Sequence, residues 1–249
     1  MSGADAVEIR TLAFGDLETD LWATAWIGSV SFIAFGSAVP GASASTVRVT
    51  ASGASAASDE WRLTGDGVDV TVSPASAAVT FAEVEGYDQL CWARGRLALD
   101  GTEWSVDAPV RRAVRAGVDF GRLDSLRDLC AWFPPDDAVA LTALRPRGAK
   151  GHAGDVIVAS VFESNGAAAV ADPRLSTTYA ADGSPARAGL ELWLGVDDAE
   201  EQFPRRAAGE ALGPHATATA DGISITAYPF RWHSRGADGA GVYLLARVT

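Results

Sequence analysis

Residues 97–106 read LALDGTEWSV, and this stretch decides the fold class. The large apolar residues Leu97 and Leu99 lead at period-two spacing into the central Asp100-Gly101 pair, and Trp104 and Val106 leave it at the same spacing. Asp-Gly tolerates the positive φ angles of a tight two-residue turn. Period-two alternation on both sides of such a turn is typical of a β-hairpin. The stretch therefore predicts two antiparallel strands joined at residues 100–101.

The same turn chemistry recurs along the chain. Five further pairs predict hairpin turns: Asp66-Gly67, Asn165-Gly166, Asp182-Gly183, Asp221-Gly222 and Asp238-Gly239. Strand-like runs occupy residues 46–50, 155–162, 190–196 and 242–248. Helical spacing is rare, and we consider a short helix only over residues 123–133 and 198–212. Short strands at such close spacing are typical of a barrel or a sandwich.

We predict an all-β chain of two lipocalin-like antiparallel β-barrels with few short helices. The first barrel is expected over residues 1–112 and the second over residues 113–249. The connecting residues 109–121 are rich in Arg and Val rather than in Gly and Ser, so they do not have the composition of a flexible linker. The two barrels are therefore expected to pack together.

Charge and composition exclude several classes of partner. The 249 residues carry a formal net charge of −12, and a field of that sign repels phosphate backbones and anionic head groups. We therefore expect no nucleic-acid partner. No apolar run reaches the roughly 20 residues of a spanning helix, so stable membrane insertion is not expected either. With no signal-peptide pattern at the N-terminus, Cys91 and Cys130 indicate two free buried thiols in a cytoplasmic protein.

The familiar metal and cofactor motifs are missing from the sequence. It contains no G-x-S-x-G, P-loop, H-E-x-x-H or C-x-x-C pattern. Its three histidines, His152, His215 and His233, lack the paired spacing of metal ligands. We therefore expect neither a bound metal nor a cofactor.

The chain is unusually rich in tryptophan. Eight tryptophans accompany a single methionine. Tryptophan fills barrel cores because each ring buries a large apolar area. Rigid rings also shape pockets for bulky apolar ligands, and their faces stabilise cations. Both interpretations stay open for any single tryptophan.

Residues 119–132 add charged groups to this apolar sequence. Asp124, Arg127 and Asp128 stand there among apolar neighbours. A carboxylic acid that is kept neutral in a dry aromatic cavity can act as a general acid. The alternative is an exposed cluster of ion pairs at the junction of the two barrels.

A second mixed segment, residues 228–233, reads YPFRWH. Alternate side chains of a strand point to opposite faces. Tyr228, Phe230 and Trp232 are therefore expected on one face, with Arg231 and His233 on the other. Only one of these faces can line a pocket.

Three segments resemble a known group of proteins. Residues 94–107, RGRLALDGTEWSVD, resemble the strand–turn–strand element of the lipocalin-like proteins grouped with carotenoid 1,2-hydratase and the AttH-like proteins. Arg127-Asp128 and Trp132 are similar to the Arg-Asp and aromatic positions between that group's two barrels. Residues 239–247, GAGVYLLAR, resemble its closing glycine-then-strand element. The resemblance implies two calycin-type barrels over the whole chain.

The resemblance also implies a function. It points to a cofactor-independent enzyme that hydrates, cyclises or isomerises a hydrophobic isoprenoid, polyene or polyketide-type substrate. Asp124 or Asp128 is then the expected proton donor, and Arg127 or Arg231 is expected to hydrogen-bond a substrate carbonyl. The expected substrate-binding residues are Trp26, Trp92, Trp132, Tyr228, Phe230 and Trp232. The alternative is a non-catalytic carrier of an apolar small molecule, and a homodimer is compatible with either function.

Overall fold

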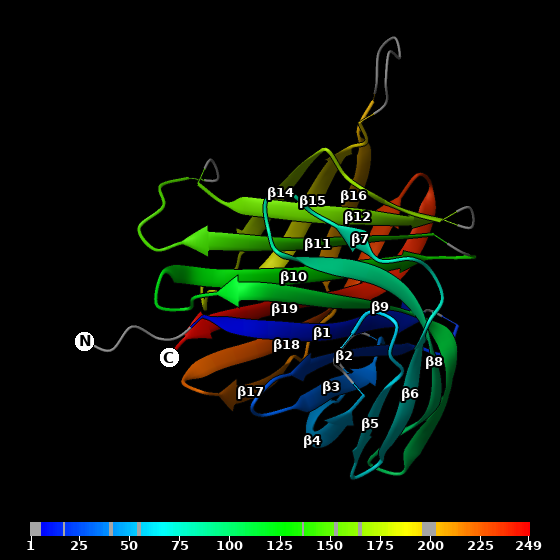
Figure 1. Ribbon diagram of the computed structural model, residues 1–249. Helices are drawn as coiled ribbons and strands as arrows, with labels where there is room; N and C mark the ends of the chain where they lie inside the picture. Colours follow the sequence, from blue (N-terminus) through cyan, green and yellow to red (C-terminus); the bar gives the residue numbers. More distant parts are fainter. Residues whose placement is uncertain are drawn as a thin grey trace.

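The computed structural model describes residues 6–16, 18–39, 42–53, 56–135, 137–151, 154–163, 166–195 and 203–249. These residues form two antiparallel β-sheets of nine and ten strands that pack together, and they contain no helix. The prediction of an all-β chain with two packed lipocalin-like barrels is confirmed. Figure 1 shows β2 to β6 of the first sheet curling in the lower half of the view and β10 to β16 of the second sheet above them.

The first sheet closes into a barrel. Its strands are β1 (Val7–Asp16), β2 (Leu21–Ile27), β3 (Phe32–Ser37), β4 (Ala44–Ser52), β5 (Trp61–Gly65), β6 (Val68–Pro74), β7 (Val79–Thr80), β8 (Gly86–Leu99) and β9 (Thr102–Val118). The order is β6-β5-β4-β3-β2-β1-β9-β8-β7, and β6 also pairs with β8. That extra pairing joins eight strands in a ring, and β7 lies beside β8.

The second sheet curls into a half-barrel. Its strands are β10 (Leu123–Phe133), β11 (Asp137–Pro146), β12 (Val156–Glu163), β13 (Gly166–Ala169), β14 (Asp172–Tyr179), β15 (Pro185–Trp193), β16 (Arg205–Ala211), β17 (Ala216–Ala220), β18 (Ile223–Ser234) and β19 (Ala237–Val248). The order is β13-β12-β11-β10-β19-β18-β16-β15-β14, with β17 paired to β18.

Four of the predicted Asp-Gly turns are confirmed, at residues 66–67, 100–101, 182–183 and 221–222. Asp100 and Gly101 adopt φ angles of 49° and 82°, the left-handed conformation that a two-residue hairpin turn requires. The turn predicted at Asp238-Gly239 is wrong. Chain reversal occurs instead at Arg235-Gly236, with φ angles of 51° and 81°, so residues 238–239 lie inside β19. Asn165 lies outside the described residues.

The two helices that we considered are not found in the described residues. Residues 123–133 form the strand β10, and residues 205–211 form β16. Residues 196–202 lie outside the described part of the chain. β10 is buried on both faces, because one face lies in the second core and the other lies against the first sheet. A strand with two buried faces loses the alternation that identifies strands in sequence.

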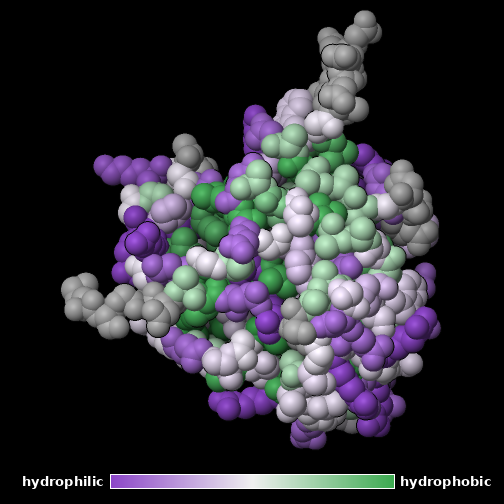
Figure 2. Space-filling view, viewed as in Figure 1, coloured by the Kyte–Doolittle hydropathy of each residue, from purple (hydrophilic) through white to green (hydrophobic). Residues whose placement is uncertain are grey.

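The interior of the first barrel is filled by side chains. Leu12, Phe14, Ile33, Leu63 and Val70 meet there, and they leave a void of only about 10 Å³. The seam between the sheets runs along β1, which lies against β10 and β19 (Figure 1). Figure 2 shows hydrophobic residues mainly in the middle and upper part of the face drawn, with hydrophilic residues around its margins.

Candidate functional site

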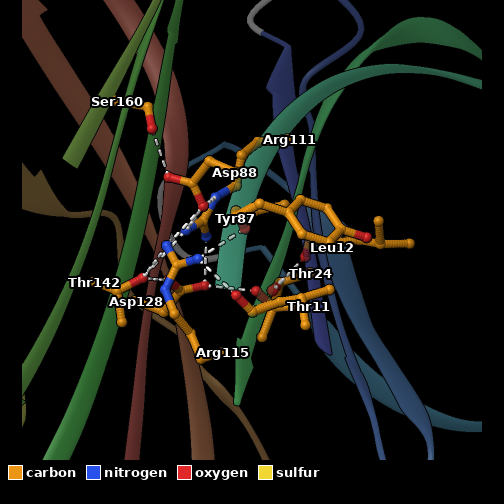
Figure 3. Close-up of polar contacts among 12 residues, drawn as sticks. Thr11, Leu12, Thr24, Tyr87, Asp88, Arg111, Arg115, Asp128, Thr142 and Ser160 are labelled. Carbon is orange, nitrogen blue, oxygen red and sulfur yellow. Dashed lines mark hydrogen bonds and ion pairs between the residues drawn. The ribbon is translucent and has the colours of Figure 1, made fainter. Parts of the chain in front are cut away.

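A buried network of charged and hydroxyl side chains joins the two sheets (Figure 3). We call it the interface network, and its members are Thr11, Asp88, Arg111, Arg115, Asp128, Thr142 and Ser160. Each member is at most 5% exposed. Two aspartates balance two arginines, so the network adds no net charge to the interior.

Asp88 of β8 is the centre of one half of the network. Its Oδ1 accepts hydrogen bonds from Arg111 Nη2 at 2.7 Å and from Arg115 Nη2 at 2.6 Å. Its Oδ2 accepts from Ser160 Oγ of β12 at 2.8 Å. Burial alone opposes the charged form, but the two guanidiniums and the hydrogen bonds outweigh it, and the pKa of Asp88 lies below its ordinary value.

Asp128 of β10 is the centre of the other half. Its Oδ2 accepts from Arg111 Nη1 at 2.7 Å and from Thr11 Oγ1 at 2.8 Å, and its Oδ1 accepts from Thr142 Oγ1 at 2.7 Å. Arg111 therefore bridges a carboxylate of each sheet. Both oxygens of Asp128 are engaged within the protein, which suits a group that holds the sheets together.

A cavity of about 310 Å³ opens at the end of the seam where β1 begins and β19 ends, at the left of Figure 1. We call it the seam cavity. Trp26 of β2 and Phe120 form one wall, with ring centroids 6.3 Å apart. Ile9, Ile223 and Val248 add apolar surface from both sheets. A largely apolar cavity of this size lies within the range of small-molecule sites.

Four polar side chains line the seam cavity: Glu8, Ser29, Arg147 and Asp221. Glu8 pairs with Arg10 at 2.5 Å. Ser29, in the β2–β3 turn, donates a hydrogen bond to Asp221, in the β17–β18 turn. That contact links the two sheets across the cavity.

A second cavity, of about 290 Å³, lies at the other end of β1. Trp132, Phe133 and three prolines form its apolar side, and Asp16, Glu18 and Asp107 bring carboxylates to it. Trp132 donates its indole N–H to the carbonyl of Ala13 at 3.4 Å, which fixes the ring between the sheets. Both cavities therefore lie along the seam, with the interface network between them.

The structure separates the three predicted catalytic residues. Asp124 is exposed, with 59% of its side chain accessible and Arg145 4.0 Å away. Arg127 is buried and pairs with Asp155 at 2.5 Å. Asp128 belongs to the interface network. None of the three lines the seam cavity or the second cavity, and their catalytic roles stay predictions.

The six predicted substrate-binding residues occupy different places. Trp26 lines the seam cavity, and Trp132 lines the second cavity. Tyr228, Phe230 and Trp232 lie in the core of the second sheet. Trp92 is 36% exposed and donates its indole N–H to Asp107 at 2.5 Å.

The predicted facing of residues 228–233 is confirmed. The three aromatic side chains are buried, whereas Arg231 and His233 are more than half exposed and both pair with Asp238. Cys91 and Cys130 are free and buried, as expected. Burial raises the pKa of the Cys91 thiol to about 11.

Sequence reasoning missed most of the polar residues at the seam. Arg111 and Arg115 stand four residues apart in β9. Arg111 lies opposite the apolar residue Leu90 of the neighbouring strand β8. Arginines in an otherwise apolar strand need buried acids, and this was the available signal for the interface network. Glu8, Arg147 and Asp221 come from three distant segments that only the fold brings together.

The described residues hold no group of three His, Cys, Asp or Glu side chains placed to bind a metal ion. His152 lies outside these residues. The described part of the chain also contains no helix that is long and apolar enough to cross a membrane.

Comparison with known proteins relates the chain to solved structures alone. No family model and no curated protein sequence matches it. The crystal structure of CghA with Sch210972 matches with a TM-score of 0.64 at 11% identity, over 98% of this chain and 89% of CghA. An AttH protein from Nitrosomonas europaea matches with a TM-score of 0.59 at 8% identity, over 99% of this chain and 95% of that one. The chain therefore has the AttH-like, lipocalin-type fold.

Proposed function

We propose that this chain binds an apolar small molecule in the seam cavity and converts it without a cofactor. The observation that carries the proposal is the cavity itself, which presents aromatic and aliphatic walls from both sheets and a few polar groups. Sites for small molecules have this composition, because the apolar walls supply affinity and the polar groups fix orientation. CghA, a protein of the same fold, has been solved with Sch210972, which supports ligand binding by this fold.

Cyclisation is the reaction that suits the described lining best. Glu8 already pairs with Arg10, and Asp221 accepts a hydrogen bond from Ser29. Among the described lining residues, the carboxylates of Glu8 and Asp221 are both exposed, so this lining supplies no buried acid. A cavity that holds a flexible substrate folded accelerates ring closure by removing conformational freedom in advance. The faces of Trp26 and Phe120 can stabilise positive charge that develops on the substrate.

Mass spectrometry tests ligand binding directly. The native mass of gently purified protein is compared with its denatured mass, and unliganded protein is then incubated with ten-carbon isoprenoids such as geraniol. We expect a bound apolar molecule that is lost in Trp26→Ala and retained in Trp92→Ala, a control tryptophan outside the seam cavity. Ile223→Trp fills the cavity rather than enlarging it and should also abolish binding. Binding that survives both cavity variants would place the ligand elsewhere.

The second candidate is a carrier, favoured by the way Glu8 and Asp221 are engaged by protein groups. Chromatography of the incubated ligand separates the two functions. A bound molecule recovered unchanged after many equivalents of exposure is the result expected of a carrier. A cyclised, hydrated or isomerised product, absent with Ile223→Trp, is the result expected of an enzyme.

A further inference from the structure

Arg147 differs from the other charged residues of the seam cavity. It follows β11, and its backbone N–H donates to the carbonyl of Arg122 at 2.8 Å, so its position beside the cavity is fixed. Arg147 is an exposed residue of the cavity lining, to which Trp26 and Phe120 also belong. The structure records no ion pair and no side-chain hydrogen bond for this guanidinium with any described residue.

The neighbouring carboxylates are already engaged. Glu8 pairs with Arg10, Asp221 accepts from Ser29, and Asp119 pairs with Arg122 at 3.2 Å. The chain carries 32 acidic residues against 20 basic ones, and among the described residues that line the seam cavity Arg147 is the only basic one. The rim thus offers a forked donor next to an apolar wall, which is the chemistry that recognises a carboxylate.

We propose that the ligand of the seam cavity is an amphipathic carboxylic acid, with its apolar body against Trp26 and Phe120 and its carboxylate on Arg147. This inference rests on the proposed function and specifies its substrate class. The volume of about 310 Å³ leaves room for on the order of ten non-hydrogen atoms, at the roughly 30 Å³ that a water molecule occupies in the liquid. The apolar body is therefore small, or only part of a longer ligand enters the cavity.

Calorimetry with a matched pair of probes tests the inference. Geranic acid and geraniol share an apolar ten-carbon body and differ in the head group, a carboxylate in one and a hydroxyl in the other. Wild-type protein should bind the acid about tenfold more tightly, the ratio that corresponds to one charge-assisted hydrogen-bonded contact. Arg147→Ala should remove that preference and leave the affinity for the alcohol unchanged.

Arg122→Ala is the matched control. It removes the same charge from the adjacent backbone partner, but Arg122 pairs with Asp119 and does not line the cavity. It should retain the preference for the acid. Equal loss of acid binding in Arg122→Ala and Arg147→Ala would show a general charge effect and overturn the inference.

The outcomes separate this inference from the proposed function. If both probes bind equally and both are lost in Ile223→Trp, the seam cavity binds apolar ligands and the carboxylate assignment is wrong. If neither probe binds at any concentration tested, the inference fails together with the proposal for this cavity. A preference for the acid that persists in Arg147→Ala assigns the head group to another residue and also overturns the inference.

Discussion

Asp88 shows how one buried carboxylate holds both sheets. It is fully buried on β8, accepts from Arg111 and Arg115 of the same sheet, and accepts from Ser160 of the other sheet. Two guanidiniums in a dry interior are tolerated only because Asp88 and Asp128 neutralise them. Removing the charge of either carboxylate leaves an excess positive charge with no access to water.

Asp88→Asn should therefore destabilise the protein by about 3–5 kcal/mol, the usual cost of breaking a buried ion pair. Asp69→Asn is the control, because Asp69 pairs with Arg62 while half exposed and should cost no more than about 1 kcal/mol. Urea unfolding followed by tryptophan fluorescence measures both. Equal stabilities of the two variants would show that the interface network does not hold the sheets together.

The site was only partly predictable at the scale of the residue. Trp26 was named because tryptophan suits an apolar wall, and it lines the seam cavity. Arg147 carried no local signal, since nothing in its neighbouring sequence indicates that Ile9 and Ile223 lie beside it. Asp128 stands as a charge among apolar neighbours in the sequence, and two of the three partners that engage it, Arg111 and Thr11, belong to the other sheet. Local patterns cannot reveal such partners.

At the scale of the element, β16 shows a constraint that depends on a neighbouring strand. Gly209 of β16 is paired with Trp232 of β18, and a Cβ atom at Gly209 would lie 2.6 Å from the indole ring. Trp232 is 1% exposed, so its ring has no free space into which it can move. A glycine here allows two strands to stay in register beneath a large ring.

Gly209→Ala should destabilise the protein by about 1–3 kcal/mol through overpacking. Gly189→Ala on the adjacent strand β15 is the control, because its Cβ would meet only the hydroxyl of Ser176, which can rotate away. Urea midpoints of the two variants, compared with wild type, provide the measurement. A larger loss in Gly189→Ala than in Gly209→Ala would contradict the packing argument.

Strands could be predicted from the sequence where one face is exposed to water. Their prediction was unreliable where both faces are buried. The hairpin at residues 100–101 combines alternation with a turn pair, and both signals are local. β10 has helical spacing in sequence because its two faces are buried by different partners. The turn after β18 was misplaced because Arg235-Gly236 adopts the positive φ angles that the sequence suggested for Asp238-Gly239.

At the scale of the whole molecule, the seam makes stability depend on pH. The pKa of Asp88 is lowered in the folded protein, whereas an aspartate in the unfolded chain has a pKa of about 3.9. Below that pH the unfolded chain binds a proton at residue 88 before the folded chain does. The stabilisation that Asp88 supplies is therefore complete above the unfolded pKa and is lost as the pH falls toward the folded value.

The stability advantage of the wild type over Asp88→Asn should consequently be constant between pH 7 and about pH 5 and should shrink below about pH 4, by up to about 1.4 kcal/mol per pH unit. Urea unfolding of both proteins at a series of pH values measures this difference, and taking the difference cancels the titration of the other carboxylates. Asp88 forms hydrogen bonds to residues of both sheets, so loss of its charge should weaken the contact between the sheets. On acidification, the two sheets should therefore separate before either hydrophobic core unfolds. A difference that stays the same down to pH 3 would show that the network holds its charges no more tightly than the unfolded chain does.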